Sequence, residues 1–273
     1  MPCVVYVQSG HDDATLRSAA TRATRLYVAF GRCTVSTLER LRAVFATVAS
    51  VDPRLDAVAV LSPDDVREAV DVVVGARPAG AFFEGSKVAE AAAAAAAAGP
   101  PPDEPSLEHA AVAVGGTFDR LHAGHRLLLA ATAAVCSQRV YVGIAGDALL
   151  ANKNLAHLLE SFEARAAAVV EYLKRANPRL EVKVSALLDP KAPPKAATVE
   201  EISALVVSEE TVAGACRVAE MRREAAIASP LAIVVVGLVE PSGQEAAGSS
   251  SSSSSSKLSS SQLRRADSVS ERR

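Results

Sequence analysis

The sequence predicts an α/β protein whose main unit is a doubly wound, five-stranded parallel sheet, preceded by a small α/β region at the N-terminus. The first observation is that five short apolar runs follow residue 110, at 111–115, 139–145, 180–188, 204–208 and 231–239. The second is that their Val, Ile and Leu residues do not alternate with polar ones, as expected for parallel strands covered by helices on both faces. The third is composition: 49% of the residues are hydrophobic but only 4% are aromatic, which favours helices packed on a Val-rich sheet.

The N-terminal region shows a similar but shorter pattern. Apolar runs at 4–7, 26–30, 55–61 and 70–74 alternate with helical patterns such as 36–48. We therefore expect an α/β unit over residues 1–88, to which the sequence assigns no function.

Changes in composition divide the rest of the chain. An alanine tract and a run of prolines predict a linker over residues 89–108, and the main domain is expected at 109–241. Eight consecutive serines lie within 242–256, a segment expected to be disordered, and order is expected to return in a C-terminal segment over 257–273.

Charge and cysteine content exclude several classes of protein. A formal net charge of −2 gives no basic excess for nucleic-acid binding, so any recognition of phosphate must be local. No apolar run reaches the length of a membrane span. The cysteines form no CxxC pair, which indicates neither a zinc ribbon nor a disulfide framework: Cys3, Cys33, Cys136 and Cys216. A cytoplasmic location is expected. Mitochondrial import is an alternative, because Arg17, Arg22 and Arg25 lie among small residues, as in a transit peptide.

The most informative stretch is VGGTFDRLHAGHR at residues 114–126, directly after the first strand of the main domain and at the start of a helix. Gly115 and Gly116 would allow the backbone to approach phosphate oxygens, and the N–H groups at the helix start would attract negative charge. His122 and His125 are three residues apart and therefore share one face of the helix. Gly124 would leave room for a base or a ribose. An alternative interpretation is a metal site formed by Asp119, His122 and His125.

This stretch resembles the GTFDxxHxGH signature of the nucleotidyltransferase superfamily, in which both histidines contact the phosphates of a nucleoside triphosphate. The downstream segments VGIAGDALLANKNLAHLLESFEARAAAVVEYL (142–173), LLDPKAPP (187–194) and VVSEETVAGACRVAEMRRE (206–224) resemble the eukaryotic-type phosphopantetheine adenylyltransferases. The resemblance implies a Rossmann-like fold and the reaction of ATP with 4'-phosphopantetheine to give dephospho-CoA and pyrophosphate, a step of coenzyme A biosynthesis.

The same resemblance implies roles for particular residues. His122, His125 and Lys153 would be catalytic, and Thr117 and Lys153 would bind phosphopantetheine. For Asp147 and Arg165 we expect a salt bridge. Contacts to ATP are implied for Gly115, Gly116, Thr117, Phe118, His122, Gly124, His125, Arg222, Ser259, Ser260, Ser261 and Arg264.

Two features differ from the family. Ala219 stands where the family has asparagine, and Lys191, Ala192, Pro193 and Pro194 stand where it has a Gly-Pro pair. The serines of KLSSSQLRR (257–265) resemble a second phosphate-binding signature but could also continue the serine tract.

The expected cofactor is Mg²⁺, entering with ATP, and the expected partners are small-molecule substrates, with no nucleic acid and no membrane. Residues 80–87 read GAFFEGSK, which is similar to a phosphate-binding loop but has its lysine out of register. We interpret the similarity as a coincidence and expect an ordinary turn there, with a separate dephospho-CoA kinase in the pathway. Two alternative functions stay open: a cytidylyltransferase for a phosphoalcohol, and a non-catalytic protein that binds CoA-like ligands.

Overall fold

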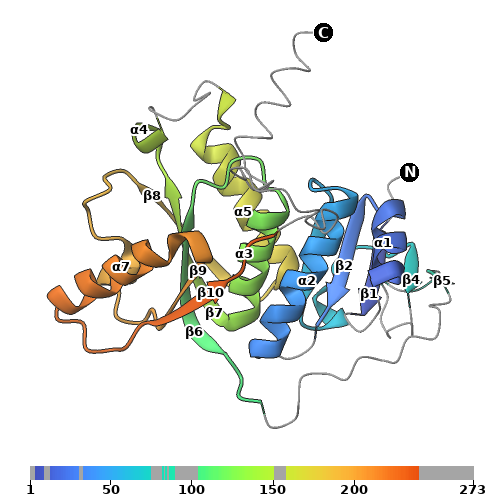
Figure 1. The fold of residues 1–273 in the computed structure, drawn as a ribbon, viewed down its shortest axis with the longest axis horizontal. Coiled ribbons are helices and arrows are strands. Elements are labelled where there is room, and N and C mark those ends of the chain that lie inside the picture. Colours follow the sequence, from blue (N-terminus) through green and yellow to red (C-terminus); the bar gives the residue numbers. More distant parts are fainter. Residues whose placement is uncertain are drawn as a thin grey trace, which may run out of the picture.

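The computed structural model of the chain describes residues 4–8, 13–30, 33–74, 82, 84, 86–89, 104–150 and 158–239. Within these ranges the chain forms two five-stranded sheets, both entirely parallel, with strand orders β3-β2-β1-β4-β5 and β10-β9-β6-β7-β8 (Figure 1). Several predicted segments lie outside the described residues: the alanine tract, the serine tract, the C-terminal segment and Lys153.

The first sheet is made by residues 4–89. Its strands are β1 (Val4–Gln8), β2 (Arg25–Ala29), β3 (Asp56–Val60), β4 (Val72–Val74) and β5 (Lys87–Ala89), with helices α1 (Asp13–Arg22) and α2 (Val35–Val51). The Thr34 hydroxyl accepts a hydrogen bond from Thr37 N and so caps α2. The N-terminal α/β region is thus a complete parallel sheet. Lys87 begins a strand, so the segment before it does not open the helix that a phosphate-binding loop requires.

The second sheet confirms the predicted fold class. Each apolar run after residue 110 forms a strand: β6 (His109–Gly116), β7 (Cys136–Ala145), β8 (Glu181–Leu187), β9 (Ala204–Ser208) and β10 (Ala232–Val236). Between them lie α3 (Ala123–Val135), α4 (Asp147–Leu150), α5 (Phe162–Ala176), α6 (Lys195–Thr198) and α7 (Val212–Glu224). Successive residues of β6 point to opposite faces of the sheet: Val112 and Val114 pack with α3, whereas Ala113 packs beneath α6 and α7.

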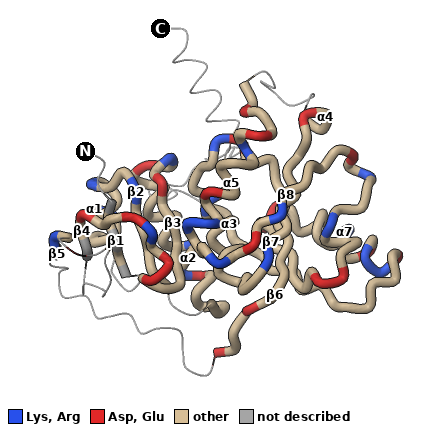
Figure 2. The backbone as a smooth tube through the Cα atoms, turned by 180° about the vertical axis from the view of Figure 1, so that it is seen from behind, with Lys and Arg blue, Asp and Glu red and all other residues tan. Residues whose placement is uncertain are grey.

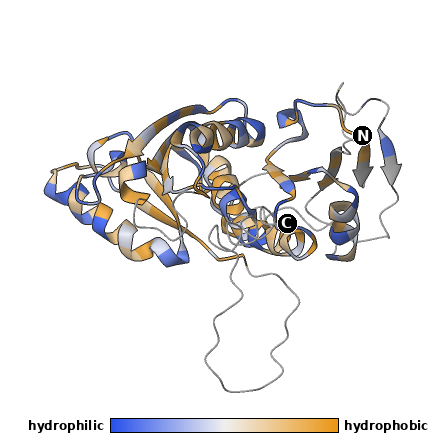
Figure 3. Cartoon of the chain, turned by 90° about the horizontal axis from the view of Figure 1, so that it is seen from above, coloured by the Kyte–Doolittle hydropathy of each residue, from blue (hydrophilic) through white to orange (hydrophobic). Residues whose placement is uncertain are grey.

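One hydrophobic core runs through both units. Leu41 and Phe45 of α2 belong to the same buried cluster as Leu127 of α3 and Leu173 of α5. Figure 1 shows α2 and α3 side by side between the two sheets, and Figure 3 shows hydrophobic residues along both strands and helices. The N-terminal unit is therefore packed against the main domain through a continuous apolar interface.

Strand β3 is an edge strand of the first sheet, and α3 and α5 of the second unit cover it. The fully buried Tyr172 donates its hydroxyl to the carbonyl oxygen of Ala57 on this strand at 3.1 Å. This contact protects an edge that would otherwise expose unpaired backbone groups.

Charged positions are interspersed along both units (Figure 2). Among the described cysteines, Cys33, Cys136 and Cys216 are free. No helix in the described part of the chain is long and apolar enough to cross a membrane.

Candidate active site

The histidine motif lies where the strand order of the second sheet reverses. Strand β6 is central, with β7 on one side and β9 on the other, and the chain leaves its carboxyl end at Gly116 toward α3. Ligands of doubly wound sheets bind in the crevice at this point. The position predicted from the sequence is therefore the position at which such a fold places a ligand.

The turn between β6 and α3 has an unusual backbone. Phe118 and Arg120 have φ angles of 54° and 46°, which residues other than glycine rarely adopt. The Phe118 ring is completely buried, and a Cβ on Gly116 would lie 3.0 Å from its Cζ atom. Gly116 is thus needed to let the Phe118 ring pack beneath the turn. The predicted contact of Phe118 with ATP stays a prediction, and the buried ring restricts it to the backbone of this residue.

A buried arginine holds this turn in place. Arg165 of α5 is completely buried, and its Nη1 donates to the carbonyl oxygens of Thr117 and Ala145, each at 2.8 Å. Its Nη2 lies 3.1 Å from Asp147 Oδ1, which confirms the predicted salt bridge. Through its bonds to Thr117 O and Ala145 O, Arg165 also joins the turn to the end of β7. The sequence predicts only the salt bridge with Asp147 and does not reveal this second role.

The two histidines stack at the start of α3. Their ring centroids are 4.0 Å apart with an interplanar angle of 27°, and the His125 ring lies 5.5 Å from that of Phe118. Burial lowers the pKa of His122 to about 4, and the charge of Arg126 acts in the same direction. His122 is therefore neutral near pH 7.

Hydrogen bonding selects the tautomer of His122. Its Nδ1 accepts from Gly124 N at 3.2 Å, so the proton of the neutral ring is on Nε2. A neutral Nε2–H donor suits an anionic ligand without adding a positive charge.

The first turn of α3 uses more of its own N–H groups than the sequence suggests. Ala123 N donates to Pro53 O at 3.0 Å, and Gly124 N donates to the His122 ring. The prediction that these N–H groups are free for a phosphate is therefore wrong at both positions. A Cβ on Gly124 would lie 3.1 Å from the His122 ring, so Gly124 makes room for the imidazole.

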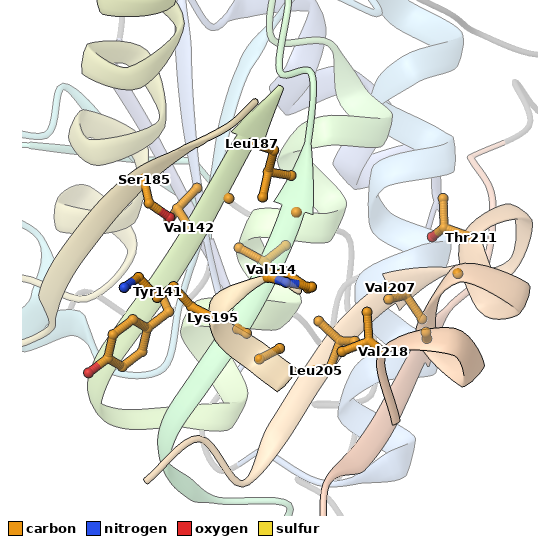
Figure 4. Close-up of a pocket in the computed structure, with 17 residues that line it drawn as sticks. Val114, Tyr141, Val142, Ser185, Leu187, Lys195, Leu205, Val207, Thr211 and Val218 are labelled. Carbon is orange, nitrogen blue, oxygen red and sulfur yellow. The ribbon is translucent and has the colours of Figure 1, made fainter. Parts of the chain in front are cut away.

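An apolar cavity of about 220 Å³ opens on the other face of the sheet, beneath α6 and α7 (Figure 4). It reaches Gly115 near the end of β6, two residues before the segment 117–125, which contains both histidines and is called the histidine turn below. Polar groups come from Tyr141, Ser185 and Thr211, and the charged residue among those lining it is Lys195. The sequence did not single out Lys195, because nothing in its local pattern shows that α6 faces a cavity.

Arg222, for which the sequence predicts a contact to ATP, is engaged by the protein itself. It is 2% exposed, and its Nη1 donates to Ala196 O and Val199 O, each at 2.9 Å. Its Nη2 donates to Glu200 O, Ile202 O and Ser229 Oγ, and its Nε donates to Ser229 O. With every nitrogen engaged by the protein, Arg222 joins the end of α7 to the loop before β9.

The remaining predicted residues divide into two groups. Gly115, Gly116, Thr117, His122, Gly124 and His125 come together at the turn, as described above. Lys153, Ser259, Ser260, Ser261 and Arg264 lie outside the described residues.

The metal-site interpretation finds no support. The Asp119 side chain is completely buried, and its Oδ1 accepts from Glu160 N at 3.0 Å and from Arg120 Nη1 at 3.1 Å. Among the described residues, no group of three His, Cys, Asp or Glu side chains could hold a metal ion.

A histidine motif at the switch point of a parallel sheet is typical of α/β proteins that bind nucleotides. Comparison with known proteins agrees: the model of the family described as cytidylyltransferase-like matches residues 113–266. The chain belongs to this family of nucleotidyltransferases.

Individual relatives point to one branch of that family. The chain is similar to the phosphopantetheine adenylyltransferase of Saccharomyces cerevisiae, with 42% identity over 127 residues, covering 46% of this chain and 41% of the yeast protein. It is 34% identical over 131 residues to the phosphopantetheine adenylyltransferase of Pyrococcus abyssi, covering 47% of this chain and 79% of that protein. The matched part therefore spans about two fifths of the yeast relative but most of the archaeal one.

A solved structure from Archaeoglobus fulgidus, of a protein with unknown function, is 28% identical. The match covers 46% of this chain and 87% of that one, with a TM-score of 0.39.

Proposed function

We propose that the protein transfers the adenylyl group of ATP to 4'-phosphopantetheine, forming dephospho-CoA and pyrophosphate in coenzyme A biosynthesis. The observation that carries the proposal is the pair of stacked histidines at the switch point of the sheet, and an apolar cavity on the other face of the sheet reaches Gly115. The names of the yeast and archaeal relatives support the same reaction.

The site suits both substrates. The pantetheine arm is long and neutral, and the cavity offers apolar walls with a few polar groups from Tyr141, Ser185 and Thr211. With the arm in this cavity, the phosphate end of phosphopantetheine would lie at Gly115, toward the histidine turn. ATP would occupy the turn itself, so that its α-phosphate meets the attacking phosphate there.

The reaction needs little proton transfer. A phosphate oxygen of phosphopantetheine forms a bond to the α-phosphorus of ATP, and the bond between this phosphorus and the oxygen bridging to the β-phosphate breaks. The bridging oxygen keeps the electron pair and leaves with pyrophosphate. The protein contributes orientation and hydrogen-bond donors to oxygens that gain charge.

We assign His122 and His125 to this role. His122, neutral and protonated at Nε2, would donate to a phosphate oxygen, and His125 would stand next to it on the same helix. Lys153 and Arg264 remain proposed sources of positive charge. Mg²⁺ is proposed to enter bound to the phosphates of ATP, which neutralises part of their charge.

Product analysis tests the proposal. Purified protein incubated with MgATP and 4'-phosphopantetheine should release pyrophosphate and form dephospho-CoA, identified by its mass. The product should carry no 3'-phosphate. Pyrophosphate release from CTP with a phosphoalcohol, or binding of phosphopantetheine without turnover, would contradict the proposal in favour of the two alternative functions.

A substitution in the cavity tests the place of the pantetheine arm. A Cβ at Gly214 of α7, which lines the cavity, would have no neighbour within 4 Å, so a larger side chain can enter without a clash. Gly214→Leu should raise KM for phosphopantetheine on the order of tenfold or more and leave KM for ATP nearly unchanged. An unchanged KM for phosphopantetheine would place the arm elsewhere.

A further inference from the structure

In the described part of the chain, a short segment of the N-terminal unit contacts the start of α3 beside His122. This segment, residues 52–56, joins the end of α2 to β3 and is called the bracing turn below. Its Pro53 carbonyl oxygen accepts the hydrogen bond from Ala123 N at 3.0 Å, and Ala123 immediately follows His122. A residue of the first unit thus holds the backbone on one side of the histidine.

The same turn acts on the other side of His122 through Arg126. The Nη1 of Arg126 donates to Leu121 O at 2.6 Å, and Leu121 immediately precedes His122. The Nε of Arg126 lies 3.7 Å from Asp56 Oδ1, an ion pair across the boundary between the two units. The bracing turn therefore fixes the backbone both before and after His122.

The bracing turn is itself well held. Asp56 Oδ2 accepts from Arg25 Nε at 2.7 Å and from Arg175 Nη1 at 2.5 Å, and Oδ1 accepts from Arg175 Nη2 at 3.2 Å. Arg25 belongs to the neighbouring strand β2, and Arg175 belongs to α5 of the main domain. Burial alone would raise the pKa of Asp56, but these arginines outweigh it and lower the pKa, so the carboxylate stays charged.

Hydrogen bonds within the bracing turn also make it rigid. Asp52 Oδ1 accepts from Arg54 N at 2.8 Å, and Asp52 O accepts from Leu55 N at 3.1 Å. Asp52 N in turn donates to Val48 O and ends α2. A rigid turn that holds both neighbours of His122 can set the direction of the imidazole, because the ring follows its backbone.

From these contacts we infer that the N-terminal unit serves the proposed reaction as a positioning module, with Asp56 as a positioning residue that acts through Arg126 on His122. The inference rests on the proposed function and assigns a task to residues 4–89. Asp56 touches neither substrate in this account. Its effect is to keep the His122 Nε2–H directed at the phosphate.

Kinetics of four variants test the inference: Asp56→Asn, Arg126→Gln, the double variant, and Arg179→Gln as the matched control. Arg179 Nη1 forms another ion pair between the units, 3.0 Å from Asp65 Oδ1, but makes no contact with the histidine turn. Asp56→Asn and Arg126→Gln should each lower kcat on the order of tenfold, with KM for ATP within about twofold of wild type. Arg179→Gln should retain the wild-type kcat.

The double variant separates positioning from general damage. If Asp56 acts through Arg126, the double variant should be no slower than Arg126→Gln alone, because both substitutions break the same chain of contacts. Multiplied losses, or a kcat of Asp56→Asn equal to that of Arg179→Gln, would overturn the inference. If wild-type protein makes no dephospho-CoA, the proposed function fails instead, which keeps the two failures distinct.

A spectroscopic readout applies even if a variant is unstable in the assay. The ¹⁵N chemical shifts of the His122 ring report its tautomer, which should be protonated at Nε2 in wild type and in Arg179→Gln. In Asp56→Asn and Arg126→Gln the ring should show a mixture of tautomers, since the Gly124 hydrogen bond is no longer held in line. An unchanged ring signal in both variants would contradict the positioning role.

Discussion

At the scale of single residues, His122 shows how burial determines chemistry. The ring is 6% exposed, and desolvation lowers its pKa to about 4. The unfolded chain would bind a proton near pH 6.5. His122 therefore lowers stability only when the pH falls below 6.5, because the unfolded state then takes up a proton that the folded state excludes until pH 4.

The first prediction follows from this difference. Between pH 6.5 and pH 4 the free energy of unfolding of the wild-type protein should fall more steeply than that of His122→Asn, by up to about 3 kcal/mol over the interval. Asparagine retains a helix-capping side chain but does not titrate. Chemical denaturation of both proteins at several pH values checks this, and parallel curves would show that His122 is not buried as a neutral ring.

Arg222 leads to the second prediction. Because its guanidinium binds backbone carbonyls and Ser229, Arg222→Met should destabilise the protein by about 3 kcal/mol or more and leave KM for ATP of the folded protein nearly unchanged. Denaturation curves and ATP titrations measure the two effects separately. A stable variant with a strongly raised KM for ATP would contradict this structural role and show that Arg222 binds phosphate.

At the scale of elements, the strands of the second sheet could be predicted because each is a continuous apolar run of suitable length. The short strand β5 could not, since Lys87–Ala89 gains its partner only when β4 lies next to it. The turn before α3 was recognised by its motif, but not how it is held. The contacts of Arg165, Arg126 and Pro53 join segments far apart in the sequence, and local patterns carry no information on such contacts.

The third prediction concerns the turn between β6 and α3. Gly116→Ala should destabilise the protein by about 1–3 kcal/mol, because the new methyl group meets the buried Phe118 ring. Gly214→Ala is the control: its Cβ has open space within a helix, and the substitution should stabilise the protein by about 0.5–1 kcal/mol. Thermal melting checks the pair, and equal melting temperatures would show that the Phe118 ring moves aside.

At the scale of the whole molecule, the two sheets have the same strand order and a common hydrophobic core. Counted from its own first strand, each has the strand order 3-2-1-4-5, and a single apolar core runs between them. The sequence suggested two units separated by a linker, and it contained no signal that α2 would pack on α3. The interface depends on the faces of two helices that are separated by about 70 residues of sequence.

The fourth prediction is that both units unfold together. Because Phe45 and Leu127 belong to one core, thermal unfolding should be a single cooperative transition in which calorimetric and van't Hoff enthalpies agree. Calorimetry on the full chain checks this. Two separated transitions would show that the interface contributes little to stability.

The central claim is that the histidine turn performs the chemical step, and the fifth prediction tests it through the single-turnover rate of dephospho-CoA formation in His125→Ala. His125 is partly buried on α3 and stacked on His122, so its removal leaves the core of the helix intact. We expect a folded His125→Ala protein whose rate is lower by roughly 10²-fold or more, as is typical for removing one hydrogen-bond donor to a transition state. A folded His125→Ala protein with a nearly wild-type single-turnover rate would contradict the account.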